Sequence, residues 1–108
     1  MQNITILQKF FEAENQRDWE TYAKFLSPDI VWELHGHTTE IIRGKTAYLI
    51  RIQEAYNNRN VQFTCKQYEC NAIQSRILTY LVNDYGQASC DIFEFKDGLI
   101  VREFEFLL

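Results

Sequence analysis

Residues Ser89 to Leu107 read SCDIFEFKDGLIVREFEFL and decide the fold of this chain. Two runs rich in aromatic and β-branched residues flank Asp97-Gly98, a dipeptide typical of two-residue hairpin turns. Such a turn sets the register of the two strands, because it places Lys96 opposite Leu99. The stretch therefore predicts a β-hairpin with a defined inner and outer face.

Counting outward from the turn gives the expected faces of this hairpin. One face would carry four phenylalanines and an isoleucine with an acid and a base among them: Ser89, Asp91, Phe93, Phe95, Ile100, Arg102, Phe104 and Phe106. The other face would be acidic and wetter: Cys90, Ile92, Glu94, Val101, Glu103 and Glu105. A carboxylate among phenylalanines is unfavourable unless it is paired, hydrogen-bonded or protonated. Asp91 therefore has either a structural partner, for which Arg102 lies diagonally within reach, or a functional role.

The composition indicates one folded domain, residues 1–108, with a single modest core. Hydrophobic residues make up 46% and aromatic residues 15% of the chain, which excludes a disordered protein. The net charge of -4, with no cluster of Lys and Arg, argues against nucleic acid as a partner. Three cysteines without CxxC spacing are typical of reduced thiols in a cytoplasmic protein. The sequence contains neither a signal-peptide pattern nor an apolar run long enough to span a membrane.

Hydrophobic periodicity predicts helices first and strands afterwards. The expected helices are Asn3–Glu14, Trp19–Leu26 with Asp18 as its N-cap, and Lys45–Asn57. The expected strands are Ile30–His35, a short one around Glu40–Ile42, Val61–Cys70, Ile73–Val82 and the two of the hairpin. Helices placed ahead of an antiparallel meander predict an α+β domain.

Four motifs follow one another along the chain: FFEAENQRDW (10–19), FLSPDIVWE (25–33), RGKTA (43–47) and DIFEFKDGLIV (91–101). Together they resemble the NTF2-like superfamily, within it the SnoaL-like and ketosteroid-isomerase-like branch. The resemblance implies a cone-shaped fold in which three N-terminal helices pack on a strongly bent, mostly antiparallel sheet around an apolar pocket. It also implies a homodimer that pairs through the outer face of the sheet.

The resemblance does not imply a steroid isomerase, since function does not follow from fold. Isomerases of this family use a Tyr near the end of the first helix, an Asp on the first strand and an Asp on the fourth strand. Phe10 and Leu34 stand at the first two positions and lack the polar group. Only Asp91 matches, so an enzyme with that set of three residues is not expected.

Three residues are candidates for acid–base chemistry. Asp91 would be a buried carboxyl with a raised pKa, able to act as acid, base or hydrogen-bond donor. Glu14 matches a pocket-lining position of the family; the alternative, an exposed glutamate, is favoured by the rarity of buried Glu. His35 could titrate near neutral pH inside a pocket or be a solvated strand residue. His35 and His37 lack a third metal ligand, so we expect no metal site.

The fold implied by the resemblance predicts a ligand pocket, with ordinary core packing as the alternative for its aromatic residues. The expected lining is Phe10, Trp32, Leu34, Tyr48, Tyr56, Tyr80, Phe93, Arg102 and Phe104. Two functions stay open. The first is binding of a small apolar molecule, with cofactor-free isomerisation, cyclisation or hydrolysis by Asp91 helped by His35 or Glu14. The second is a non-catalytic dimeric binding or structural module.

Overall fold

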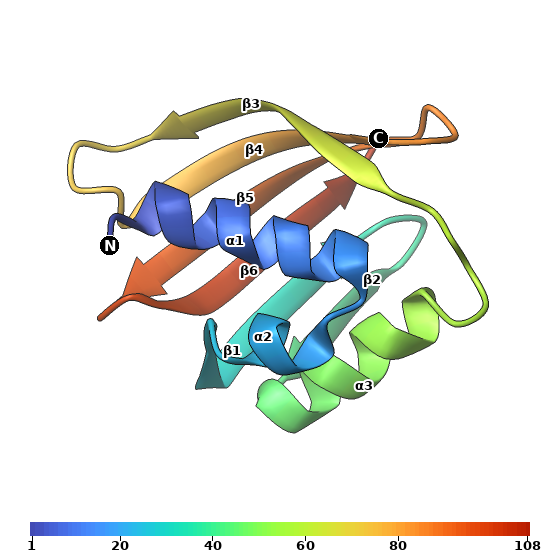
Figure 1. Ribbon diagram of the computed structural model, residues 1–108, viewed down its shortest axis with the longest axis horizontal. Helices are drawn as coiled ribbons and strands as arrows, with labels where there is room; N and C mark the ends of the chain where they lie inside the picture. Colours follow the sequence, from blue (N-terminus) through green and yellow to red (C-terminus); the bar gives the residue numbers. More distant parts are fainter.

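The computed structural model describes residues 1–108 as three helices and a six-stranded sheet (Figure 1). The helices are α1 (Asn3–Gln16), α2 (Trp19–Ala23) and α3 (Lys45–Ala55). The strands are β1 (Leu26–His35), β2 (Thr39–Arg43), β3 (Phe63–Cys70), β4 (Arg76–Asn83), β5 (Ala88–Lys96) and β6 (Leu99–Leu107). Their order in the sheet is β2-β1-β6-β5-β4-β3, and only β1 and β6 run parallel.

The predicted α+β class and order of elements are confirmed, and the largest difference in boundaries lies where α2 ends and β1 begins. Asp18 caps this helix as predicted, since its Oδ1 accepts the Thr21 amide at 3.2 Å. However, the helix ends at Ala23, and Leu26 already belongs to β1. The carbonyl of Phe25 accepts the Ile100 amide at 2.9 Å, which starts the pairing of β1 with β6.

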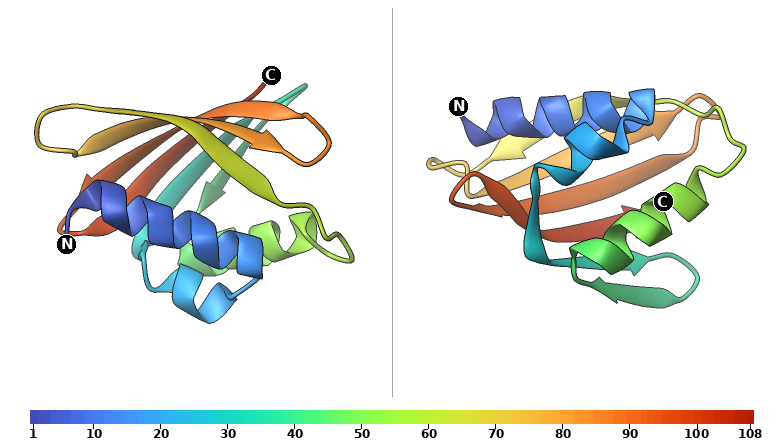
Figure 2. Two further views of the ribbon diagram at one scale, coloured as in Figure 1. Left: turned by 45° about the horizontal axis from the view of Figure 1, so that its top comes forward. Right: turned by 60° about the horizontal axis from the view of Figure 1, so that its bottom comes forward.

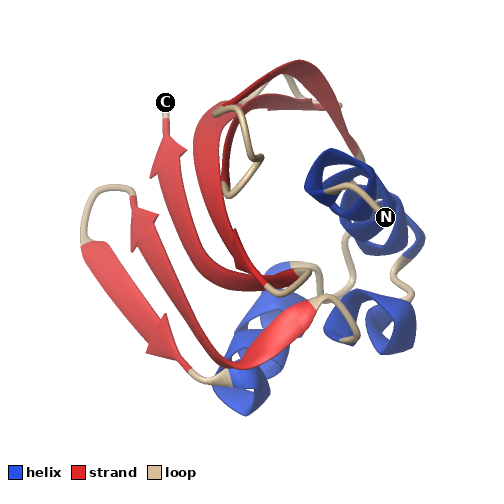
Figure 3. Ribbon diagram, turned by 90° about the vertical axis from the view of Figure 1, so that its left-hand side faces the viewer, coloured by secondary structure: helices blue, strands red, loops and turns tan.

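The sheet is strongly bent but not closed, and α1 lies in its concave side (Figure 3). The amphipathic pattern of α1 explains this position, because one stripe of the helix is buried. That stripe consists of Ile6, Leu7, Phe10, Phe11 and Ala13. Helix α3 packs against β1 and β2 at the other end of the curved sheet (Figure 2). None of the three helices is long and apolar enough to cross a lipid bilayer.

The predicted turn between β5 and β6 is confirmed. Asp97 and Gly98 both have positive φ, 52° and 75°, as a type I′ turn requires. Lys96 pairs with Leu99. The turn therefore begins the hairpin in the expected register.

Beyond the turn, the predicted register is wrong by one residue. A β-bulge at Val101 shifts β6, so that Glu94 pairs with Arg102, and Asp91 pairs with Glu105 instead of Phe104. The bulge lies where the β1 backbone first bonds to β6, and it lets β6 bend from its partner β5 onto β1.

The one-residue shift exchanges the two faces of β6. Arg102, Phe104 and Phe106 lie on the outer face, whereas Glu103 turns inward and is buried. The outer residues find partners there: the Phe106 ring stacks on His35 with centroids 4.9 Å apart, and the Arg102 guanidinium lies over the Phe104 ring at 5.5 Å. The inward placement expected for Arg102 and Phe104 is therefore corrected.

Candidate functional site

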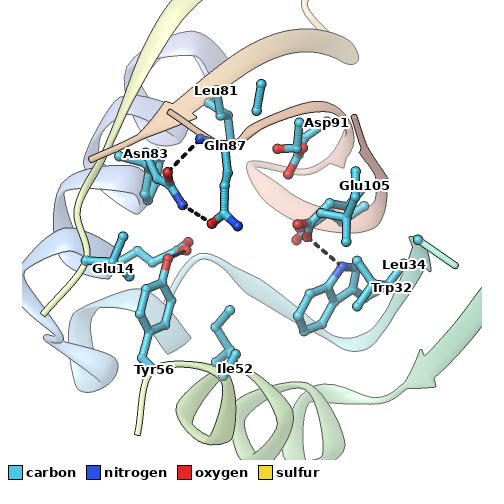
Figure 4. Close-up of a pocket in the computed structure, with 18 of the residues that line it drawn as sticks. Glu14, Trp32, Leu34, Ile52, Tyr56, Leu81, Asn83, Gln87, Asp91 and Glu105 are labelled. Carbon is cyan, nitrogen blue, oxygen red and sulfur yellow. Dashed lines mark hydrogen bonds between the residues drawn. The ribbon is translucent and has the colours of Figure 1, made fainter. Parts of the chain in front are cut away.

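A cavity of about 710 Å³ lies between the concave face of the sheet and the C-terminal ends of α1 and α3 (Figure 4). Its apolar wall comes from both helices and from four strands: Phe11, Trp32, Leu34, Ile52, Leu81, Phe93 and Leu107. Exposed residues such as Arg59 and Gln87 form its rim. The volume is in the range of sites that bind small molecules.

Three carboxyl groups converge on one wall of this cavity. Asp91, Glu103 and Glu105 each place an oxygen within 4.8 Å of the others. The bulge at Val101 brings this about, because it turns both glutamates of β6 to the face that carries Asp91. Asp91 and Glu103 are only 3% and 5% exposed. We refer to Asp91, Glu103 and Glu105 as the carboxyl cluster.

Each glutamate of the carboxyl cluster accepts one hydrogen bond. The indole Nε1 of Trp32 donates to Glu105 Oε1 at 3.2 Å. The Tyr48 hydroxyl donates to Glu103 Oε1, and the hydroxyls of Tyr48 and Tyr22 are 2.9 Å apart in the buried core. These bonds fix the two glutamates and lower their pKa values, although burial outweighs this effect and raises the pKa of both.

Asp91 is the least satisfied member of the cluster. Its Oδ1 is buried and has no hydrogen-bond partner, while Thr79 donates only to the Asp91 backbone carbonyl, at 2.9 Å. Burial and then the nearby Glu105 carboxyl raise the pKa of Asp91 well above its ordinary value. Burial therefore favours the protonated form of these carboxyls, and a protonated carboxyl can donate a hydrogen bond that a carboxylate cannot.

Glu14 faces the same cavity from α1. Its Oε2 accepts the Tyr56 hydroxyl of α3 at 2.5 Å, so the side chain points inward and is not an exposed glutamate (Figure 4). Burial raises the pKa of Glu14 from 4.5 to about 7, and the bond from Tyr56 offsets only part of this shift. Glu14 can therefore gain or lose a proton near neutral pH.

The structure brings six of the predicted site residues to the cavity: Asp91, Glu14, Trp32, Leu34, Tyr56 and Phe93. Phe10 and Tyr48 are buried in the core without lining the cavity, and the Phe10 ring stacks on Tyr22 at 4.0 Å. His35 lies on the opposite side of β1 from Trp32, next to Glu33, because neighbouring residues of a strand alternate in direction. The expected placement of His35 in the pocket is therefore wrong.

Tyr80, Arg102 and Phe104 also lie outside the cavity. Tyr80 pairs with Cys90 on the outer face of the sheet and is 38% exposed. In contrast, Glu103 and Glu105 belong to the site and were expected to face outward. Along β6, glutamates alternate with phenylalanines. The usual rule that aromatic residues face the core predicts that the phenylalanines point inward, whereas in the structure the glutamates do.

Comparison with known protein families identifies the class of this protein. A family model described as "SnoaL-like domain" matches residues 7–103. The chain therefore belongs to the SnoaL-like domain family, and its cone-shaped α+β fold is that of the NTF2-like superfamily. A search of curated proteins finds no match.

Several solved structures share this fold. A protein from Kribbella flavida, provisionally described as a ketosteroid isomerase, is 25% identical with a TM-score of 0.82; the alignment covers 98% of this chain and 77% of that one. An LEH-like epoxide hydrolase from M. tuberculosis is 21% identical with a TM-score of 0.77, covering 98% and 82%. A protein from Sinorhizobium meliloti, provisionally described as a polyketide cyclase, is 18% identical with a TM-score of 0.80, covering 97% and 99%.

The raised pKa of Glu14 predicts how stability depends on pH. A carboxyl whose pKa is 4.5 unfolded and about 7 folded binds more protons in the folded state between these values. Its contribution to the free energy of unfolding is therefore complete below pH 4.5 and is lost as the pH rises through 7. Glu14→Gln, which keeps an acceptor for Tyr56, should lose less stability between pH 5 and pH 8 than the parent protein.

Urea unfolding at a series of pH values measures this difference. Glu12→Gln is the matched control, because Glu12 is exposed on the same helix. Its stability curve should run parallel to that of the parent protein. A Glu14→Gln curve that also runs parallel would contradict a buried, protonated Glu14.

Proposed function

We propose that this SnoaL-like protein binds a small, largely apolar molecule in the cavity and catalyses cofactor-free proton transfer on it. The observation that carries the proposal is the Asp91 carboxyl, which is buried at the cavity wall with an unpartnered Oδ1. A polar group without a partner at such a site is available to a ligand, and satisfying it is favourable. The apolar wall around it supports a ligand with an apolar body.

The proposed chemistry uses two carboxyl positions on opposite sides of the ligand. Protonated Asp91 donates a hydrogen bond, or its proton, to a carbonyl or epoxide oxygen on which negative charge develops. Glu105, which pairs with Asp91 across the strands, is placed to exchange protons with it. Glu14, with a pKa of about 7, is suited to remove a proton from the other side of the ligand.

The reaction class rests on this geometry and on the similar structures. Their names include a ketosteroid isomerase, a polyketide cyclase and an epoxide hydrolase. We propose isomerisation, cyclisation or hydrolysis of a carbonyl compound or an epoxide. Asp91 has the central role and Glu14 assists.

Asp91→Asn tests the catalytic role. An amide cannot transfer the proton, so turnover of a responsive compound from a panel of cyclic enones and epoxides should fall by at least about 100-fold. The free energy of unfolding should change by less than about 1 kcal/mol at neutral pH, because Asn has nearly the shape of a protonated Asp. Turnover by mass spectrometry and urea unfolding measure the two effects.

Asp29→Asn is the control for this substitution. Asp29 is exposed on β1 and does not line the cavity, so its variant should keep parent turnover. A large loss of stability in Asp91→Asn, with unchanged turnover, would show that Asp91 is structural.

A second candidate function, a non-catalytic dimeric module, is favoured by the outer face of the sheet. Leu78, Tyr80 and Phe106 are 37%, 38% and 39% exposed there. The strand registers place Leu78 in one row with Ile92 and Phe104, and Tyr80 in the next row with Cys90 and Phe106. A continuous apolar surface of this kind is typical of an interface between proteins. We propose that two copies of the chain pair through this face.

Tyr80→Glu tests the dimer. A charge in the middle of the apolar rows would have to be desolvated in the interface, so the variant should sediment as a monomer where the parent sediments as a dimer. Sedimentation velocity over a range of protein concentrations is the measurement. Gln8→Glu, which adds the same charge on the exposed side of α1 away from the sheet face, is the control. A parent protein that stays monomeric at high concentration would contradict pairing through this face.

A further inference from the structure

The ionisable side chains inside the cavity are mostly acidic. Four carboxyl groups line it, three in the carboxyl cluster and Glu14 opposite. No Lys is among the lining residues, and the basic side chains that line the cavity are Arg51, Arg59 and His37. None of them forms a hydrogen bond or ion pair with the carboxyl cluster, although the charge of Arg51 lowers the pKa of Glu105 in part. Arg59 is exposed at the rim, and Arg51 donates from Nε to Glu40 Oε2 of β2 at 2.8 Å. The buried carboxyl cluster therefore has no direct contact with a basic side chain of the protein, and Asp91 Oδ1 has no partner of any kind.

Asp91 marks where a positive group would bind. Its Oδ1 has no partner, whereas the two glutamates beside it are held by Trp32 and Tyr48. Figure 4 shows the carboxyls of Asp91 and Glu105 next to each other at one end of the cavity. A cationic N–H donor there would meet two carboxyls at once, and charge-assisted bonds of this kind are the strong ones.

The rest of the cavity indicates the chemical character of the rest of the ligand. The volume of about 710 Å³ is much larger than the cluster needs, and the apolar part of the wall includes side chains such as Ile52, Leu81 and Phe11. A cation without an apolar body would leave this wall in contact with water. The cavity fits a molecule that has a charged head and an apolar tail.

We propose that the natural ligand carries a basic nitrogen on an apolar body, and that this ammonium group binds between Asp91 and Glu105. The inference rests on the proposed function, because it names the ligand class of that same cavity. The ammonium group supplies the positive charge that the carboxyls otherwise take from bound protons. With such a ligand Asp91 acts as a carboxylate that holds the ammonium group, and Glu14, across the cavity, is the group left for proton transfer.

Three probes that share one apolar body and differ in the head group test this inference. Phenylpropylamine, phenylpropanol and phenylpropionate are titrated into the protein at neutral pH by calorimetry. The amine should bind at least about ten-fold more tightly than the alcohol, and the acid should bind least of the three. In Asp91→Asn the preference for the amine over the alcohol should fall to about two-fold or less, with little change for the alcohol.

Two further variants and calcium chloride serve as a second test and as controls. Glu105→Gln removes the other half of the ammonium site and should give the same loss of preference. Because Glu105 is only half-buried, this variant can replace Asp91→Asn in the test if Asp91→Asn does not fold. Asp29→Asn should keep the preference of the parent protein. Calcium chloride alone should bind weakly and should not displace the amine, because it lacks the apolar body.

The outcomes separate the inference from the proposed function. Equal binding of amine and alcohol would overturn the ammonium site and leave a cavity that binds neutral ligands, which the proposed function also allows. Calcium that binds alone and displaces the amine would make the carboxyl cluster a metal site and overturn the inference. If none of the probes binds, both the ligand class and the cavity's binding role fail.

Discussion

The site depends on one extra residue in β6. The bulge at Val101 lets the strand leave its hairpin register and pair with β1, and the same step turns every later side chain of β6 to the other face. Without it, two phenylalanines would fill the concave side of the sheet and the glutamates would face solvent. With it, three carboxyls meet in an apolar cavity. The bend of the sheet and the chemistry of the site therefore have one structural origin.

Buried acids destabilise a fold, so other contacts must offset them. The aromatic core supplies these contacts next to the site. Phe11 packs edge-on against Phe93 at 5.5 Å and against Phe63 at 5.3 Å, and fully burying one such side chain contributes about 1.5–3 kcal/mol. The Tyr48 hydroxyl satisfies Glu103 from within this core. The acids are thus held in a packed, buried environment, and their raised pKa values follow from that burial.

Much of the fold could be predicted from the sequence, because it is encoded locally. The Asp97-Gly98 turn, the Asp18 cap and the stripe of α1 each depend on neighbours in the chain. The class and the order of elements follow from these signals. The inward direction of Asp91 was also predictable, since the bulge lies on β6 and leaves the alternation of β5 intact.

The rest of the site could not be predicted, because it depends on contacts between distant segments. Nothing near Val101 indicates a bulge; it arises where β1 pairs with β6. Glu14 bonds to Tyr56, which lies 42 positions further along the chain. The direction of His35, in contrast, is local, since alternation along β1 places it opposite Trp32; on the outer face its ring stacks on Phe106. The errors on β6 therefore follow from one long-range pairing, that of β1 with β6.

The most direct measurement is an NMR titration of the side-chain carboxyl carbons of Asp91 and Glu105 in the intact protein. We expect the Asp91 carbon to keep the chemical shift of a protonated carboxyl well above pH 3.8, with a titration linked to that of Glu105. An Asp91 carboxyl that titrates independently near 3.8, as in an unfolded chain, would contradict the convergence of the three acids.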